Sequence, residues 1–225
     1  IDLAGEAGGA QELAWLVDKL GVAGEGDPAW QAIMKIFRRS NSTVLAEWAA
    51  RIKSAAMVGK TTSEQQVSFF TLAEQKAQTE NKGELLKDAQ ATLADLYFVS
   101  GSLKQASEYL KVLLIGASAQ EKPAIQGRLV QVHLMLGSVD QACELLSNYL
   151  STKDLDLGPQ NAVVKSIDAY LNSPTTVNPA GLLDAMEKIQ VAEPKTQQAW
   201  RALLNGWTER YARARKAEDT GKTVN

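Results

Sequence analysis

One segment of this sequence returns at a fixed interval. Residues 101–106 (GSLKQA) reappear 36 positions later as residues 137–142 (GSVDQA), and Leu114 matches Leu150 at the same spacing. A period of this length is typical of helical repeats. Each unit of such a repeat cannot bury its apolar face alone, so the units stack and form an extended surface. The repeat therefore favours a stacked helical architecture whose surface serves for binding.

Apolar residues recur at helical spacing along nearly the whole sequence. Alternating runs of β-branched and polar residues, which are typical of strands, are absent. We therefore expect an all-α fold, an antiparallel array of helical hairpins with about ten or eleven helices. The helices are expected at residues 11–20, 28–39, 44–57, 63–77, 85–100, 103–114, 124–136, 139–150, 159–171 and 180–189, and from 194 onward.

Several helix ends carry recognisable local signals. Asp27 before Pro28 marks a helix start, because aspartate accepts from exposed amides and proline fits the first helical position. Gly101 and Gly137 are expected to supply tight turns between the paired helices. Capping patterns with a hydroxyl residue followed three positions later by glutamine occur at Thr62–Gln65, Ser102–Gln105 and Ser138–Gln141.

Composition shifts divide the chain into regions. The polar stretch at 78–83 separates an N-terminal helical region, residues 1–80, from the repeats at 84–190. A final helix at 194–217 is expected to cover the last repeat, because solenoids need a terminal cap for solubility. Residues 218–225 are predicted to be a disordered tail. The apolar stripe of the final helix consists of Trp200, Leu203, Leu204, Trp207 and Tyr211.

The two repeated units resemble tetratricopeptide repeats. The first unit supplies Ala94, Tyr97, Gly101, Ala106 and Leu110, and the second supplies Val130, His133, Gly137, Ala142 and Leu146. Val130 and His133 depart from the small residue and tyrosine usual in that family, and the period exceeds its usual length by about two residues. The resemblance covers residues 88–150 and extends weakly to 189. It implies a right-handed superhelix.

In that family the first helix of each unit lines a concave groove, so the resemblance implies a set of partner-binding residues. Phe98, Leu134 and Met135 would be apolar anchors, and Asp95, Arg128 and Gln131 would set polar specificity. The complete predicted set is Asp95, Phe98, Val99, Arg128, Gln131, Leu134 and Met135. The alternative is that the three anchors pack into neighbouring units instead.

No residue pattern marks catalysis, a cofactor or a metal. His133 is the only histidine and Cys143 the only cysteine, so neither a histidine-based triad nor a zinc site is indicated. Residues 59–61 (GKT) resemble the end of a phosphate-binding loop, but Ser54 stands where that motif needs glycine, and a helical pattern precedes it. We therefore predict no enzyme, with no catalytic, cofactor-binding or metal-binding residue.

Charge and hydropathy exclude some classes of partner. The formal net charge is −2, from 24 basic and 26 acidic residues, so bulk charge predicts no nucleic-acid partner. No apolar run approaches the ~20 residues that span a bilayer. The single cysteine allows no intrachain disulfide, which fits either the cytoplasm or a bacterial periplasm reached after removal of a targeting segment. The sequence leaves the location open.

These expectations converge on a non-enzymatic scaffold that binds a peptide or helix of a partner protein in a concave groove. The alternative is a structural role, as one segment of a longer solenoid or a homo-oligomeric assembly. The start at Ile1 rather than methionine and the tryptophan-rich ends of the chain motivate that alternative. A third and weaker hypothesis is an enzyme with a carboxylate-based site among the N-terminal helices.

Overall fold

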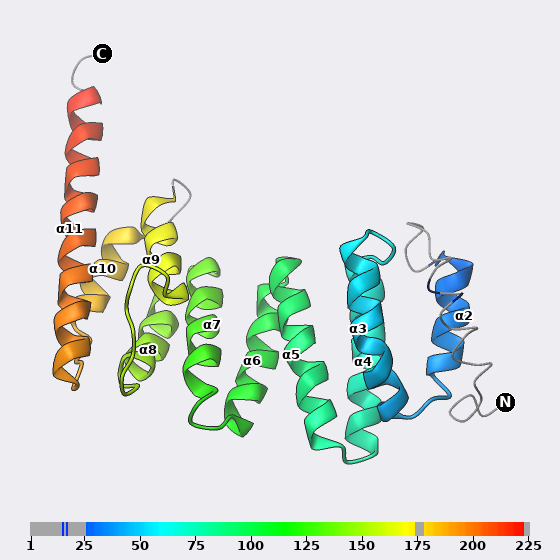
Figure 1. Cartoon of the computed structure of the whole chain (residues 1–225). Helices are drawn as coiled ribbons and strands as arrows, with labels where there is room; N and C mark the ends of the chain where they lie inside the picture. Colours follow the sequence, from blue (N-terminus) through cyan, green and yellow to red (C-terminus); the bar gives the residue numbers. More distant parts are fainter. Residues whose placement is uncertain (1–14, 16, 18–25, 174–177, 223–225) are drawn as a thin grey trace. The chain divides into compact units, whose positions relative to one another are not determined.

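The computed structural model describes residues 15, 17, 26–173 and 178–222, and for 217–222 the backbone alone (Figure 1). In this part of the chain the structure has ten α-helices and no strand, which confirms the all-α prediction. Of the helix expected at 11–20, only residues 15 and 17 are described, so the rest of that prediction lies outside the described residues. The helices are α2 (Pro28–Phe37), α3 (Ser42–Met57), α4 (Ser63–Thr79), α5 (Gly83–Val99), α6 (Leu103–Gly116), α7 (Lys122–Met135), α8 (Val139–Leu150), α9 (Ala162–Asn172), α10 (Pro179–Glu187) and α11 (Pro194–Lys222).

The helices form two compact units, which divide inside α6: Ile1–Tyr109 is unit 1 and Leu110–Asn225 is unit 2. The division therefore does not fall at 78–83, where the polar stretch predicted it. Polar contacts that cross this stretch explain the difference. Glu74 of α4 accepts hydrogen bonds from Gln90 Nε2 of α5 at 3.0 Å and from the Tyr109 hydroxyl of α6 at 2.9 Å.

In unit 1, α4 contacts α2, α3 and α5, and α3 also contacts α5. Aromatic side chains dominate the core between these helices. Phe69 lies edge-on to both Phe37 and Phe70, with ring centroids 5.0 Å apart in each pair, and Trp48 lies 6.1 Å from Phe37. Edge-to-face pairs are a favoured aromatic geometry, so these rings fix the relative position of α2, α3 and α4.

The connections in unit 1 follow the local signals of the sequence. Asp27 accepts hydrogen bonds from the amides of Ala29 and Trp30 at the start of α2. Thr62 and Gln65 form the predicted capping box at the start of α4. Gly59 has a φ of +71°, a conformation that ends α3, so the GKT segment is a helix end followed by a cap, as the sequence indicated.

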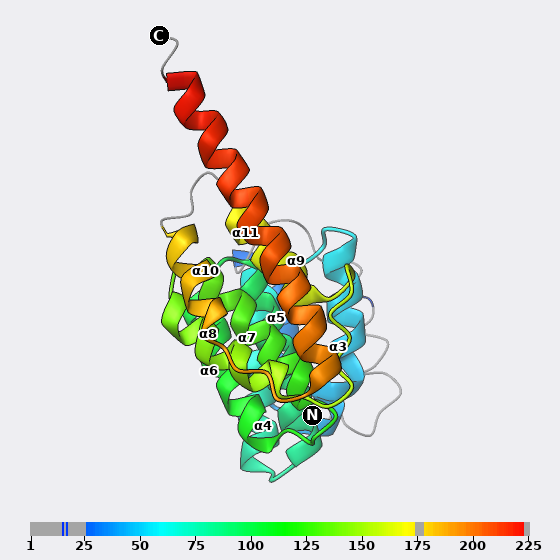
Figure 2. The same cartoon turned by 90° about the vertical axis from the view of Figure 1, so that its left-hand side faces the viewer.

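In unit 2, α7 contacts α8 and α9, α10 contacts α8 and α11, and α11 contacts α9. Trp200 and Trp207 of α11 are buried, with ring centroids 5.8 Å apart, and they join the core that these helices share. The C-terminal part of α11 extends beyond the other helices of this unit (Figure 2). Helix α11 continues to Lys222, so the predicted tail at 218–225 is wrong for 218–222, and 223–225 lie outside the described residues.

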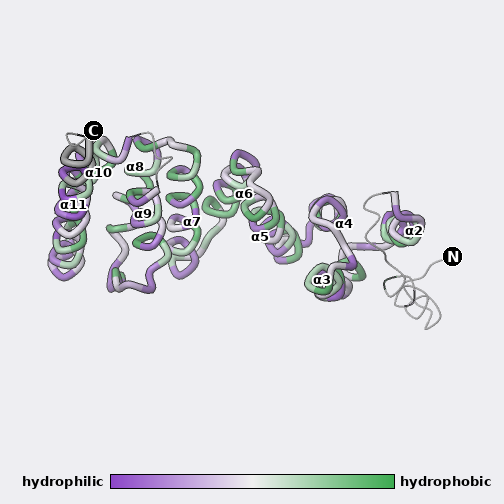
Figure 3. Tube along the Cα trace, turned by 90° about the horizontal axis from the view of Figure 1, so that it is seen from above, coloured by the Kyte–Doolittle hydropathy of each residue, from purple (hydrophilic) through white to green (hydrophobic). Residues whose placement is uncertain are grey.

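Hydrophilic and hydrophobic residues are interspersed along the helices (Figure 3). Among the described residues, no helix is both long enough and apolar enough to cross a membrane. Helices α2 and α8, for example, each bury an apolar stripe and expose the opposite face.

A candidate binding groove in the first helical unit

Helices α3, α4 and α5 of unit 1 enclose an open groove with a volume of about 470 Å³. Its walls are unusually rich in small side chains, because six alanines line it: Ala46, Ala49, Ala50, Ala73, Ala89 and Ala91. Ala46 and Ala50 of α3 and Ala91 of α5 are exposed, so their methyl groups face the open space. Small residues leave room for another chain to approach the helix backbones closely. We name this site the α3–α5 groove.

The floor of the α3–α5 groove is apolar and rigid. Phe70 of α4 is 2% exposed, and Leu45 of α3 is fully buried beside it in the same core. Phe70 is held by its edge-on contact with Phe69. A bound side chain would therefore meet a floor that is already packed in place and does not need to be ordered on binding.

One side chain crosses the groove. Lys53 of α3 donates a hydrogen bond from Nζ to Thr92 Oγ1 of α5 at 2.9 Å. The same ammonium lies 5.2 Å from the centre of the Phe70 ring, within the range of a cation–π interaction. Lys53 is exposed, so this bridge is reversible and can move when another group enters.

Acidic side chains line the α5 rim. Asp88, Thr92 and Asp95 follow one another at spacings of four and three residues, which places them on one face of the helix, and all three line the groove. Asp88 and Asp95 are exposed. The rim therefore presents two carboxylates with a hydroxyl between them.

Hydrogen bonds between Ser42 at the start of α3 and Glu80 after α4 fix one end of the groove. The Glu80 carboxylate accepts from the Ser42 amide at 3.1 and 3.2 Å and from the Ser42 hydroxyl at 2.7 Å. These hydrogen bonds hold the pKa of Glu80 below its ordinary value. Ser42 also lines the groove, so this contact sets the position of the α3 wall.

The predicted binding residues fall into both units. Asp95, Phe98 and Val99 belong to unit 1, and Asp95 lines the α3–α5 groove. Phe98 is half-buried and Val99 is 80% exposed, and both lie further along α5, outside the lining of the groove.

The other four predicted residues lie on α7 in unit 2. Met135 is 58% exposed, and Arg128 and Gln131 are half-buried. Leu134 is 2% exposed and packs in the core of unit 2. It therefore cannot offer its side chain to a partner, and its predicted role as an anchor is wrong.

The α3 wall of the groove was not among the binding residues predicted from the sequence. The signal that could have found it is the run of small residues at helical spacing, Ala46, Ala49 and Ala50, followed by Lys53. Such a run indicates a helix face that another chain can approach.

The Cys143 thiol and the His133 imidazole of unit 2 both have shifted pKa values that favour their neutral forms. Burial, and then the neighbouring Asp140 charge, raises the pKa of the Cys143 thiol to about 11, so the thiol is protonated at neutral pH. Burial, and then the charge of Lys111, lowers the pKa of His133, which favours a neutral imidazole. Within the described ranges, no group of three or more histidine, cysteine or acidic residues could hold a metal ion.

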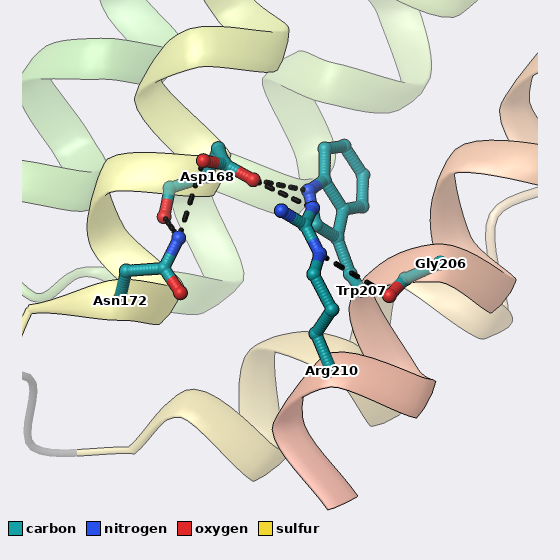
Figure 4. Close-up of polar contacts among 5 residues, drawn as sticks. All are labelled: Asp168, Asn172, Gly206, Trp207 and Arg210. Atoms are coloured by element: carbon teal, nitrogen blue, oxygen red, sulfur yellow. Dashed lines mark hydrogen bonds and ion pairs between the residues drawn. The ribbon is translucent and has the colours of Figure 1, made fainter. Parts of the chain in front are cut away.

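A second polar cluster joins α9 to α11 (Figure 4). Asp168 Oδ1 accepts from Trp207 Nε1 at 3.0 Å and from the Arg210 guanidinium at 2.7 Å. The Asn172 amide donates to the other oxygen of Asp168 at 3.2 Å. The Asp168 carboxylate is thus occupied by groups of its own unit, which makes this cluster a structural tie.

Comparison of the chain with protein-family models, curated proteins and solved structures gave no match. The resemblance to tetratricopeptide repeats therefore rests on the residues of this sequence alone.

Proposed function

We propose that this chain is a non-enzymatic scaffold that binds a segment of a partner protein in the α3–α5 groove. The observation that carries the proposal is the groove itself, an open volume of about 470 Å³ with a packed aromatic floor, alanine walls and an acidic rim. An apolar centre with a polar rim is the usual composition of a protein-binding surface.

The tetratricopeptide-like arrangement is part of this proposal. Helices α5 and α6 are followed at the repeat interval by α7 and α8, and of these α7 contacts α8. The turn inside each pair contains a glycine in the left-handed conformation, with φ of +77° at Gly101 and +70° at Gly137. Equal turns at equal spacing support two copies of one structural unit.

Site-specific crosslinking tests the proposal. A photoreactive benzoylphenylalanine would replace Ala91 in the groove, and in a control variant it would replace Ala202, an exposed alanine of α11. We expect illumination in a lysate of the native organism to give a defined crosslinked protein from position 91 and none from position 202. The same products from both positions would contradict the groove as the binding site.

Self-association is the second candidate function, and exposed apolar residues favour it. Met57 is 88% exposed and Val58 70% exposed at the end of α3. Such a tip could contact another copy in a longer assembly. Sedimentation of the wild type and of Met57→Glu would test this candidate. A wild type that stays monomeric at high concentration would contradict it.

A further inference from the structure

We infer that the α3–α5 groove recognises a basic side chain of its partner, a lysine or arginine that lies beside small apolar residues. The inference rests on the proposed function of the groove and names the chemistry of its occupant. It is carried by the position of Lys53 and by the acidic row on α5.

The groove already holds a cation from its own chain. The Lys53 ammonium lies over the Phe70 ring and donates to Thr92 Oγ1, so an aromatic face and a hydroxyl together form its binding site. Aromatic faces attract cations through the ring quadrupole. The side chain of a partner lysine has the same length and charge as Lys53 and can take the same place when Lys53 moves aside, and the guanidinium of a partner arginine can stack on the same ring.

The α5 rim favours a second positive charge. Asp88 and Asp95 are seven residues apart, which is roughly 10 Å along the helix axis, and Thr92 lies between them. The charged residues that line the groove are Asp88, Asp95 and Lys53, so carboxylates outnumber ammonium groups in the lining. A basic segment is attracted to this rim, and an acidic segment or a nucleic-acid phosphate is repelled.

The walls select the neighbours of the basic residue. Three exposed methyl groups, from Ala46, Ala50 and Ala91, leave the helix backbones accessible. Small or short apolar side chains can seat on these methyl groups while the basic side chain reaches the α5 rim. The occupant is therefore a protein segment in which a basic residue lies beside small apolar residues.

Selection from a random dodecapeptide library displayed on phage tests the inference on the full chain. We expect peptides selected by the wild type to be enriched in lysine and arginine over aspartate and glutamate. Their binding to the double variant Asp88→Asn, Asp95→Asn should be roughly three- to tenfold weaker, since exposed ion pairs contribute modestly. Glu47→Gln removes an exposed carboxylate of α3 that does not line the groove and should bind like the wild type.

A groove-filling variant, Ala91→Trp, separates this inference from the proposed function. The selected peptides could fail to bind Ala91→Trp and yet show no enrichment in basic residues and bind the Asp88→Asn, Asp95→Asn double variant as tightly as the wild type. That result would overturn the inference and leave the groove function standing. If Ala91→Trp blocks none of the selected peptides, or if no peptide is selected, the groove function fails and the inference fails with it.

Discussion

At the scale of single residues, Asp168 and Glu80 show two ways in which a carboxylate stabilises a helical array. Asp168 joins two helices by accepting from Trp207 and Arg210. Glu80 lies at the end of α4 and accepts from the backbone and hydroxyl of Ser42 at the start of α3. Both carboxylates satisfy donors that would otherwise lie partly buried without partners, and each position therefore gives a testable prediction.

We predict that Asp168→Ala lowers the free energy of unfolding by about 1–3 kcal/mol, because the buried Trp207 indole loses its acceptor. Urea titration followed by tryptophan fluorescence measures the change. Asp168→Asn, which keeps an acceptor oxygen, should lose less. Arg210→Gln removes only an exposed ion pair and should cost about 1 kcal/mol or less. An Asp168→Ala protein as stable as the wild type would show that α11 does not depend on this cluster.

The Glu80 contact predicts a pH dependence. Hydrogen bonds from the Ser42 hydroxyl and amide lower the pKa of Glu80 in the folded chain from the ordinary 4.5. A lowered folded pKa means that the stabilisation is present above the ordinary pKa and is lost as pH falls through the folded value. The stability advantage of the wild type over Glu80→Gln should therefore shrink as pH falls from about 6 to about 3. An advantage that stays constant over this range would contradict the assigned contact.

At the scale of helices and turns, local signals predicted more than long-range ones. The Asp27 cap and the Thr62–Gln65 capping box form as the sequence indicated, because each depends only on residues three or fewer positions apart. Ser138 was expected to cap α8, yet it makes no side-chain cap hydrogen bond. Its ψ is 70°, whereas Thr62 has 167°, so Ser138 lacks the extended backbone that directs a capping hydroxyl at the helix amides.

The candidate site was predicted only in part, because local patterns identify a helix face but not the helices that pack against it. Asp95 lies on a helix face that the repeat pattern could identify, and it does line the groove. Leu134 occupies the position 36 residues after Phe98, but helices from elsewhere in unit 2 bury it. Whether a repeat position is exposed depends on which neighbours pack there, and a single sequence does not specify those neighbours.

The turn after α7 gives a prediction for how glycine substitutions change the free energy of unfolding. Gly137 has a φ of +70°, and no atom lies within 4 Å of an added Cβ, so only backbone strain opposes a larger residue. We expect Gly137→Ala to lower the free energy of unfolding by about 1–2 kcal/mol. Gly206→Ala, inside α11 and equally open, should instead raise it by roughly 0.5–1 kcal/mol. Thermal unfolding followed by circular dichroism compares them, and equal effects of the two substitutions would contradict this account.

At the scale of the whole molecule, the chain consists of two units that each have their own core. Asp168 makes its side-chain hydrogen bonds within unit 2, so a change at this residue should act first within that unit. We expect Asp168→Ala to speed amide hydrogen exchange in α9 and α11 and to leave α3, α4 and α5 unchanged. Hydrogen exchange with mass spectrometry resolves these helices. Faster exchange throughout the chain would show instead that the two units unfold together.

The α3–α5 groove is proposed to bind a segment of a partner, and affinity measured with the groove filled is the sharpest test of that role. The probe is a peptide selected on the wild-type chain, titrated by calorimetry into the wild type, Ala91→Trp and Ala202→Trp. Ala91 lines the groove, and Ala202 is an exposed alanine on α11. We predict that Ala91→Trp weakens binding at least about tenfold, or 1.4 kcal/mol, while Ala202→Trp binds like the wild type. Equal affinity of all three proteins would contradict the account.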